Sequence, residues 1–260
     1  MNRLQDAVTI ITGGANGMGR LACERFVDEG ALVVVADLDQ AAVDAVAGAL
    51  NDLHGSEVAI GVAVDVRMPE QVEAMVAVAV DRFGGLDVLY NNAGVSPGDD
   101  DTPVNTSIET WDFTFDVNVK GVFLCAKYGI PAMLSSGGGS IVNVASFVAH
   151  MGAATPQIAY TSSKGAVLSM TKEIAAIYAR HGIRCNALCP GPVLTPLLAK
   201  FLSDDAKRQR RLVHIPMGRF GEAHEMVNGA LFLASSESSY MTGQSLLIDG
   251  GITSTYTTPE

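Results

Sequence analysis

Short apolar runs that alternate with helical segments constrain the fold of this chain more than any other feature. These runs are apolar throughout and rich in valine, which is typical of parallel strands buried on both faces. Segments with helical periodicity separate them, as expected when helices cover both faces of a sheet. The sequence therefore predicts an α/β fold, a doubly wound parallel sheet of about seven strands. The expected strands are 7–12, 31–36, 58–64, 86–90, 140–145, 183–189 and 245–248.

The chain is expected to form a single domain over residues 1–260. Its 260 residues are 48% hydrophobic, which is ample for one large core in an α/β architecture. The segment 194–220, rich in proline, leucine and basic residues, is expected to be a mobile substrate lid. The expected helices are 18–29, 40–53, 70–83, 107–134, 159–181 and 222–235.

The overall charge favours small molecules as partners. With 17 basic and 28 acidic residues the net charge is -11, which argues against binding to nucleic acid or to an anionic membrane. Glycines, serines and prolines interrupt the long uncharged stretch 128–163, so we expect no membrane span there. The start of the sequence lacks a signal-peptide pattern, which predicts a cytoplasmic protein.

Cysteine and histidine spacing predicts neither a disulfide framework nor a metal site. The 4 cysteines form no CxxC pair and lie in apolar contexts, so buried free thiols are expected. The 5 histidines show no ligand spacing, and no metal is expected.

A glycine-rich turn follows the first expected strand. Gly13, Gly17 and Gly19 are spaced as GxxxGxG and lead directly into a helix. Glycines at such a turn let the backbone approach a pyrophosphate, and the helix N-terminus favours its negative charge. Glycines also occur in such turns for purely steric reasons, so the motif alone leaves both interpretations open.

Asp37, at the end of the second expected strand, predicts the cofactor. A carboxylate at this distance from the glycine turn can accept hydrogen bonds from the adenosine ribose and repel a 2′-phosphate. We therefore expect NAD rather than NADP. The alternative is that Asp37 caps the helix that begins near Asp39.

The stretch from Ser146 to Lys164 carries groups suited to acid/base chemistry on a carbonyl. Tyr160 and Lys164 are four residues apart, so on a helix they share a face. An ammonium held beside a phenol would lower the phenol's pKa from about 10. Such a pair can arise by chance, but the chain has no Asp, Glu, Lys or Arg between Lys127 and Lys164, which favours a functional lysine. Ser146 follows an expected strand, at the edge where α/β sheets bind ligands.

These motifs together resemble the short-chain dehydrogenases/reductases, and the resemblance covers essentially the whole chain. The matching residues are Thr12-Gly13-xxx-Gly17-x-Gly19, Asn91-Asn92-Ala93-Gly94, Asn118, Ser146, Tyr160-xxx-Lys164 and Pro190-Gly191. The resemblance implies a Rossmann-like domain and an NAD-dependent oxidoreductase. It also implies a homotetramer built from the helices 107–134 and 159–181 and the last strand.

The resemblance also assigns roles to single residues. It implies that Tyr160 is the general acid/base, that Ser146 hydrogen-bonds the substrate oxygen, and that Lys164 lowers the pKa of Tyr160 and binds the nicotinamide ribose. Asn118, a polar residue among apolar neighbours within an expected helix, would hold a water in a proton relay; a purely structural partner is the alternative. The expected cofactor-binding residues are Gly13, Asn16, Gly17, Met18, Gly19, Asp37, Leu38, Asp65, Val66, Asn92, Ala93, Gly94, Tyr160, Lys164, Pro190, Gly191, Val193 and Thr195.

One departure from the family pattern concerns the substrate pocket. One residue more than in most members separates Ser146 from Tyr160, so we expect the loop 150–157 to bulge. His150, Met151 and Gln157 are candidates to line the pocket, although His150 has an equal chance of being a loop residue with no role there.

The predicted reaction is hydride transfer between a secondary alcohol or ketone and the nicotinamide, with Tyr160 exchanging the hydroxyl proton. A 3-oxoacyl-thioester (acyl-carrier-protein) reductase is one alternative, although Asp37 disfavours its usual NADPH form. Another alternative is a catalytically idle NAD-binding scaffold. Replacement of the Ser, Tyr or Lys would favour this alternative, but all three residues are present.

Overall fold

The computed structural model describes residues 2–194 and 204–258 and contains one seven-stranded sheet in the order β3-β2-β1-β4-β5-β6-β7. Every pairing in this sheet is parallel. The predicted parallel sheet of seven strands is thus confirmed; the assignment of a single domain to 1–260 stays a prediction. The strands are β1 (Val8–Thr12), β2 (Leu32–Asp37), β3 (Ala59–Ala63), β4 (Val88–Asn91), β5 (Gly139–Val144), β6 (Ile183–Pro190) and β7 (Ser245–Ile248).

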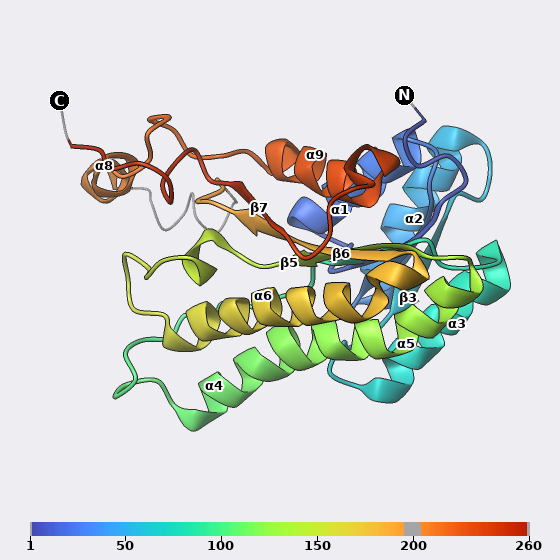
Figure 1. The fold of residues 1–260 in the computed structure, drawn as a ribbon, viewed down its shortest axis with the longest axis horizontal. Helices are drawn as coiled ribbons and strands as arrows, with labels where there is room; N and C mark the ends of the chain where they lie inside the picture. Colours follow the sequence, from blue (N-terminus) through green and yellow to red (C-terminus); the bar gives the residue numbers. More distant parts are fainter. Residues whose placement is uncertain (1, 195–203, 259–260) are drawn as a thin grey trace.

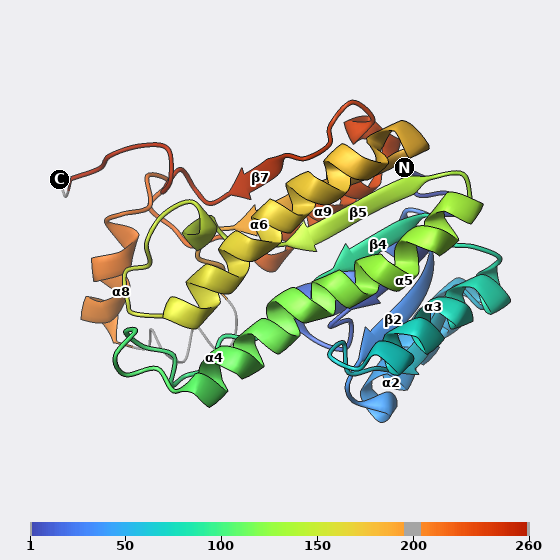
Figure 2. The same cartoon turned by 60° about the horizontal axis from the view of Figure 1, so that its bottom comes forward.

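Helices cover both faces of the sheet, as predicted. Helices α1, α2 and α9 pack on one face, and α3, α5 and α6 pack on the other (Figure 1). Figure 2 shows α5 and α6 crossing the second face, with α4 continuing the line of α5. The helices are α1 (Gly17–Asp28), α2 (Gln40–His54), α3 (Pro69–Phe83), α4 (Ile108–Phe115), α5 (Gly121–Ser135), α6 (Ile158–Tyr178), α8 (Asp205–Leu212) and α9 (Ala223–Ala234).

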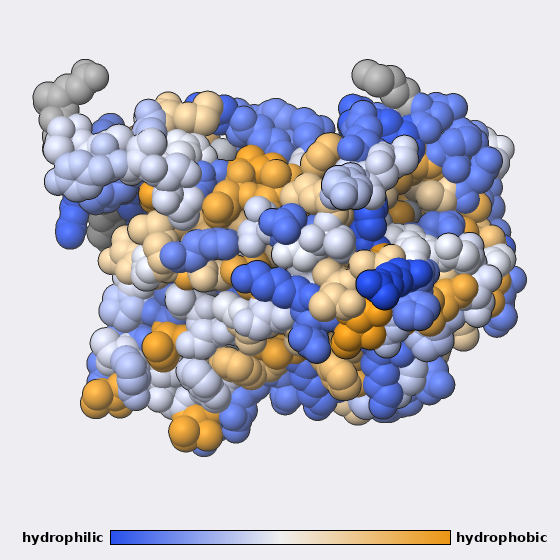
Figure 3. Space-filling view, viewed as in Figure 1, coloured by the Kyte–Doolittle hydropathy of each residue, from blue (hydrophilic) through white to orange (hydrophobic). Residues whose placement is uncertain are grey.

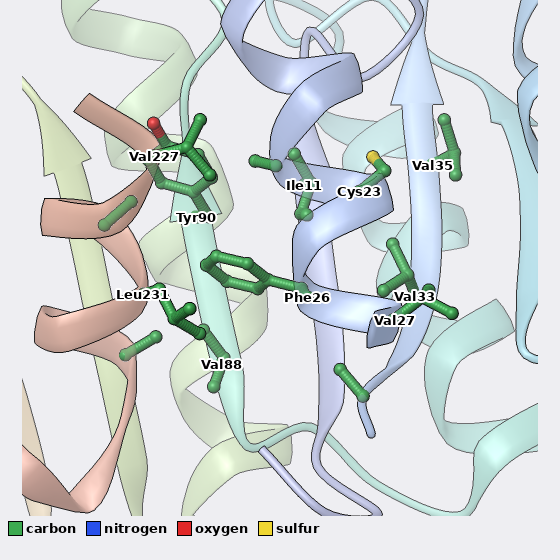
Figure 4. Close-up of a cluster of buried hydrophobic side chains, with 14 of the residues drawn as sticks. Ile11, Cys23, Phe26, Val27, Val33, Val35, Val88, Tyr90, Val227 and Leu231 are labelled. Carbon is green, nitrogen blue, oxygen red and sulfur yellow. The ribbon is translucent and has the colours of Figure 1, made fainter. Parts of the chain in front are cut away.

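The core on the first face centres on an aromatic pair. The rings of Phe26 and Tyr90 are stacked with centroids 6.1 Å apart, and Val227 and Leu231 of α9 lie beside them (Figure 4). Phe26 is 0% exposed. Truncation of such a phenylalanine to alanine typically costs about 3–5 kcal/mol, because a cavity remains. This packing fixes α1, and with it the glycine turn, against the sheet.

The strand order creates the crevice in which a ligand can bind. Strand β1 has β2 on one side and β4 on the other, so the chain reverses its direction across the sheet after β3. In open α/β sheets, ligands bind at such a switch point, beyond the carboxyl ends of the strands. The strand arrowheads in Figure 2 point toward the side that carries α8 and the C-terminal segment. The predicted site residues that follow β1, β4 and β5 therefore share one edge.

One segment differs from the sequence prediction, and the role of a second segment as a lid stays a prediction. The long helix expected at 107–134 is interrupted by a π-helix, η1 (Asp116–Lys120), which contains Asn118. A π-helix accommodates one extra residue, and such bulges frequently occur at functional sites. The expected lid at 194–220 contains helix α8 and the buried side chains of Ile215 and Phe220; its residues 195–203 lie outside the described part of the chain.

Apolar and polar side chains are interspersed on the face drawn in Figure 3. All 4 cysteines are buried free thiols, as predicted. Within residues 2–194 and 204–258, every helix is too short or too polar to cross a membrane.

Candidate active site

The glycine turn joins the end of β1 to α1. Gly13 has φ +67°, and a Cβ at Gly19 would collide with the Gly13 carbonyl. Both positions therefore require glycine for steric reasons. Within the described residues, Asn16 at the N-cap of α1 makes no side-chain capping bond, so the first amides of α1 are available to an anion. The steric and the pyrophosphate interpretations are thus compatible.

The turn after β4 is fastened to the glycine turn. The Thr12 hydroxyl accepts hydrogen bonds from the backbone N–H groups of Asn92 and Ala93, both at 3.1 Å. In return the Asn92 side-chain amide donates to the carbonyls of Thr12 and Gly13, at 3.0 and 3.2 Å. The two turns therefore form one rigid wall at the switch point.

A cavity of about 360 Å³ lies against this wall. Its lining runs from the glycine turn to the ends of β2 and β3, which is where open α/β sheets bind ligands. Most of the predicted cofactor residues line it: Gly13, Asn16, Met18, Gly19, Asp37, Leu38, Asp65, Val66, Asn92, Ala93 and Gly94. Sequence reasoning missed six further lining residues: Ala36, Val64, Arg67, Val95, Phe113 and Val117.

The other predicted cofactor residues lie elsewhere or are not described. Gly17, with φ +55°, is at the start of α1, and Pro190 ends β6. Gly191 and Tyr160 line a second cavity, and Val193 forms a bridge with Gly221. Thr195 lies outside the described residues.

Asp37 stands at the end of β2 with both carboxylate oxygens engaged by the turn. One oxygen accepts from the Ala15 N–H at 3.1 Å and the other from the Leu38 N–H at 2.7 Å. Asp39, not Asp37, caps α2, because its side chain accepts from the amides of Ala41 and Ala42. The capping alternative for Asp37 is therefore excluded, and its half-buried carboxylate faces the cavity.

Arg67 brings a positive charge to the same cavity, but that charge is already paired. Its guanidinium contacts both carboxylate oxygens of Asp65, with the shortest distance 2.6 Å, and holds the pKa of Asp65 below its usual value. The guanidinium also lies 5.4 Å from the centroid of the Phe113 ring. The sequence signal that could have found Arg67 is its place two residues after Asp65.

Ser146 and Tyr160 meet at the next part of the edge. Ser146 follows β5, is 5% exposed, and its hydroxyl accepts from the Val148 N–H at 3.4 Å. Tyr160 lies in the first turn of α6 and lines the same cavity as Ser146. Burial raises the pKa of Tyr160, and the nearby Ser146 hydroxyl opposes that rise.

Lys164 lies one helical turn after Tyr160, as predicted, but its charge acts differently from the prediction. Its Nζ donates to the Val144 carbonyl at 2.8 Å and lies 5.6 Å from the centroid of the Tyr160 ring. Burial of this side chain, which is 4% exposed, lowers the pKa of Lys164 to about 8. The pKa of Tyr160 is raised by the burial of its own side chain, so the expected lowering of this pKa by Lys164 is not met.

Asn118 has structural partners. Its side-chain amide donates to the Val95 carbonyl at 2.9 Å and to the Ser163 hydroxyl at 3.0 Å, and its oxygen accepts from the Val95 N–H at 2.8 Å. Asn118 therefore joins the segment after Gly94 to helix α6, which carries Tyr160. The structural alternative for this side chain is confirmed, and its place in a water relay stays a prediction.

A second, larger cavity of about 950 Å³ opens beside Ser146 and Tyr160. Met151 and Gln157 line it, as predicted; among the described lining residues His150 does not occur, and its Nε2 lies 3.7 Å from the Cys189 sulfur. Sequence reasoning missed the part of the wall formed by residues 252–258 and by Arg211, Val213 and His214. The run of hydroxyl side chains in 253–258 was the available signal.

Similarity to known proteins places the chain in a class of oxidoreductases that use a nicotinamide cofactor. A family model described as enoyl-(acyl carrier protein) reductase matches residues 13–253. A 2,5-dichloro-2,5-cyclohexadiene-1,4-diol dehydrogenase of Sphingobium indicum is 41% identical over 97% of this chain and 99% of its own length. The chain belongs to the short-chain dehydrogenase/reductase family.

Two further relatives also match this chain over nearly their whole length. A 2-(R)-hydroxypropyl-CoM dehydrogenase of Xanthobacter autotrophicus is 37% identical over 95% of this chain and 98% of its own length. A 3-oxoacyl-[acyl-carrier-protein] reductase of Thermotoga maritima is 39% identical over 96% of this chain and 99% of its own length.

Proposed function

We propose that this protein is an NAD-dependent dehydrogenase that interconverts a secondary alcohol and its ketone, with Tyr160 as the general acid/base. The observation that carries the proposal is that Ser146 and Tyr160 line the same larger cavity, with Lys164 one helical turn after Tyr160. This pair lies beside a wall that fits a dinucleotide. A nicotinamide bound along that wall would accept or supply the hydride.

The residues of the chain have distinct roles in this proposal. The hydroxyls of Ser146 and Tyr160 hold the substrate oxygen, and Tyr160 gives a proton to it during reduction or takes one during oxidation. Because burial raises the pKa of Tyr160, its protonated form is favoured near neutral pH, which suits reduction. We expect alcohol oxidation to become faster as the pH rises into the alkaline range.

The larger cavity supports a small or cyclic secondary alcohol as substrate. Its wall combines apolar side chains such as Phe147 and Met151 with the hydroxyl groups of residues 253–258. Two relatives carry names of dehydrogenases for a cyclohexadiene diol and for hydroxypropyl-CoM. Asp37 supports NAD over NADP, since its carboxylate faces the place of the adenosine ribose.

The Thermotoga relative favours reduction of a 3-oxoacyl thioester as a second candidate. An idle NAD-binding scaffold has less support, because Ser146, Tyr160 and Lys164 are all present and brought together. The test is nicotinamide absorbance with NAD⁺ and NADP⁺ across secondary alcohols, cyclic alcohols, sugars and 3-hydroxyacyl thioesters. Tyr160→Phe is the blank and should bind NADH without turnover; retained turnover in this variant contradicts the proposal.

The proposal includes a cytoplasmic homotetramer. Exposed apolar side chains on α4, α5 and α6 support an interface there, since Ile108, Phe123 and Ile177 are 71%, 52% and 50% exposed. Light scattering should give about four times the mass of the 27.2 kDa chain, and a monomer mass would overturn the assignment. Cell fractionation tests the location.

A further inference from the structure

Helix α6, which carries Tyr160, takes its N-terminal cap from a distant loop. Within the described residues, Gln157 at the N-cap position makes no side-chain capping bond. The Ile158 N–H instead donates to the Asp101 carbonyl at 3.1 Å. The N–H groups of Ala159 and Tyr160 donate to the two carboxylate oxygens of Asp100, at 3.0 and 2.8 Å. The amide of the catalytic tyrosine is thus held by a carboxylate 60 positions earlier in the sequence.

The carboxylate of Asp100 is itself fixed. Asp100 is 8% exposed, and one of its oxygens also accepts from the Thr106 hydroxyl at 3.4 Å. The same hydroxyl accepts from the Asp101 N–H at 2.9 Å. The neighbouring Asp99 accepts from the hydroxyl of Thr110 in α4. The loop 96–106 is therefore fastened to the starts of both α4 and α6.

The donors around Asp100 compensate for the burial of its carboxylate. A buried carboxylate needs hydrogen-bond donors or a cation, and within the described residues no ion pair includes Asp100. The N–H groups and the positive dipole end of α6 supply the donors and the positive charge. Hydrogen bonds from backbone N–H groups to a carboxylate are stronger than those between neutral groups. Helices α2 and α4 differ, because Asp39 and Ser107 cap them locally.

We propose that Asp100 is a positioning residue, which sets the first turn of α6 and thereby the place of the Tyr160 hydroxyl relative to Ser146. The proposal rests on the proposed function, in which that hydroxyl exchanges the proton. It also couples the loop 96–106 to catalysis, so that a change in this loop moves the acid/base as well as the surrounding wall. A misplacement of about 1 Å at a reacting group can cost about 100-fold in rate.

Two substitutions and one matched control test the coupling. Asp100→Ala removes both acceptors, and Asp100→Asn keeps the shape and one acceptor. Asp101→Asn removes a neighbouring charge but keeps the backbone carbonyl that caps Ile158. We expect kcat to fall about 100-fold in Asp100→Ala, less in Asp100→Asn, and less than threefold in Asp101→Asn. KM for NAD⁺ and the Kd for NADH should change less than threefold in all three.

Several results would overturn the proposal. One is a folded Asp100→Ala or Asp100→Asn enzyme with kcat within threefold of wild type. Another is a loss of NADH binding in parallel with kcat, which indicates collapse of the whole site. If Asp100→Ala does not fold, the kcat and NADH binding of Asp100→Asn alone test the proposal.

A separate readout distinguishes this proposal from the proposed function. Amide hydrogen exchange on the full chain should show faster exchange at 158–160 in Asp100→Asn, with the strands unchanged. If the wild type turns over no alcohol, the proposed function fails, and the exchange data still test the cap. Unchanged exchange at 158–160 would refute the positioning role whatever the activity.

Discussion

The substitution Asp37→Asn tests whether one carboxylate selects the cofactor. Asp37 lies at the cavity of about 360 Å³ and accepts hydrogen bonds from Ala15 and Leu38. Asparagine preserves the shape and one acceptor, so the strand end should keep its conformation. The substitution removes the negative charge and one of the two oxygen atoms that can accept hydrogen bonds from a ribose.

Two effects of this change add in the ratio of NADH to NADPH affinity. A hydrogen bond to a charged group contributes about 1.5–3 kcal/mol, which NADH loses. Repulsion between the carboxylate and a 2′-phosphate at about 4 Å costs about 1 kcal/mol in water and more in the protein, and NADPH is relieved of it. Arg67 does not offset this repulsion in the wild type, because Asp65 already holds its guanidinium. The lower limits sum to about 2.5 kcal/mol, or about 70-fold in the affinity ratio.

The assay is fluorescence titration of NADH and NADPH into wild type and variant at one salt concentration. Asp39→Asn is the matched control, because it removes a carboxylate two residues away that caps α2 and lies outside the cavity lining. We expect the control to leave the ratio unchanged. A ratio that changes less than threefold in Asp37→Asn, or a wild type that prefers NADPH, would refute the reasoning.

Three further predictions concern stability and substrate binding. Burial lowers the pKa of Lys164 to about 8 from 10.5, so between these pH values the unfolded chain binds more protons than the folded chain. The free energy of unfolding should therefore rise with pH across this window. Urea titrations of Lys164→Met should lack that rise. Hydrogen bonds from Arg3 lower the pKa of Glu29 to about 2 from 4.5, so the stabilisation that they give is complete above pH 4.5 and is lost toward pH 2. In Glu29→Gln the free energy of unfolding should depend less on pH between 4.5 and 2. An equally steep dependence would contradict this prediction. Deletion of residues 254–260 removes part of the wall of the larger cavity. In steady-state kinetics, KM for the alcohol should rise about tenfold while KM for NAD⁺ changes less than twofold. Equal changes in both KM values would disprove a role of this segment that is specific to the substrate.

Sequence patterns predicted the strands well, because each strand is a short apolar run, and the central strands β1, β4 and β6 are almost entirely buried. The run 183–189 corresponds to β6 (Ile183–Pro190), and 245–248 corresponds to β7. The site residues after β1, β4 and β5 could be predicted for a related reason. Parallel strands bring their carboxyl ends to one edge, so residues that directly follow strands must lie together.

The remaining features depend on information that periodicity does not contain. The helix pattern of 107–134 gives no sign of the π-helix at 116–120, because one extra residue shifts the apolar face only locally. The hydroxyl run in 253–258 marks a polar segment, but only the path of the chain after β7 brings the segment 252–258 to the larger cavity. The lowered pKa of Lys164 follows from burial, and burial is a property of the assembled fold.

Hydrogen bonds between the separate motifs explain why they act together. The glycine turn is fastened to the turn after β4, and Asn118 fastens the end of that turn, at Val95, to Ser163 of α6. The Ser163 hydroxyl in turn donates to the Tyr160 carbonyl at 2.7 Å. A Cβ at Gly94 would lie 3.3 Å from the Lys164 Nζ, so glycine lets this wall approach Lys164 closely. The wall of the smaller cavity and helix α6 are therefore joined by hydrogen bonds into one unit, and Asp100 holds the start of α6 within that unit.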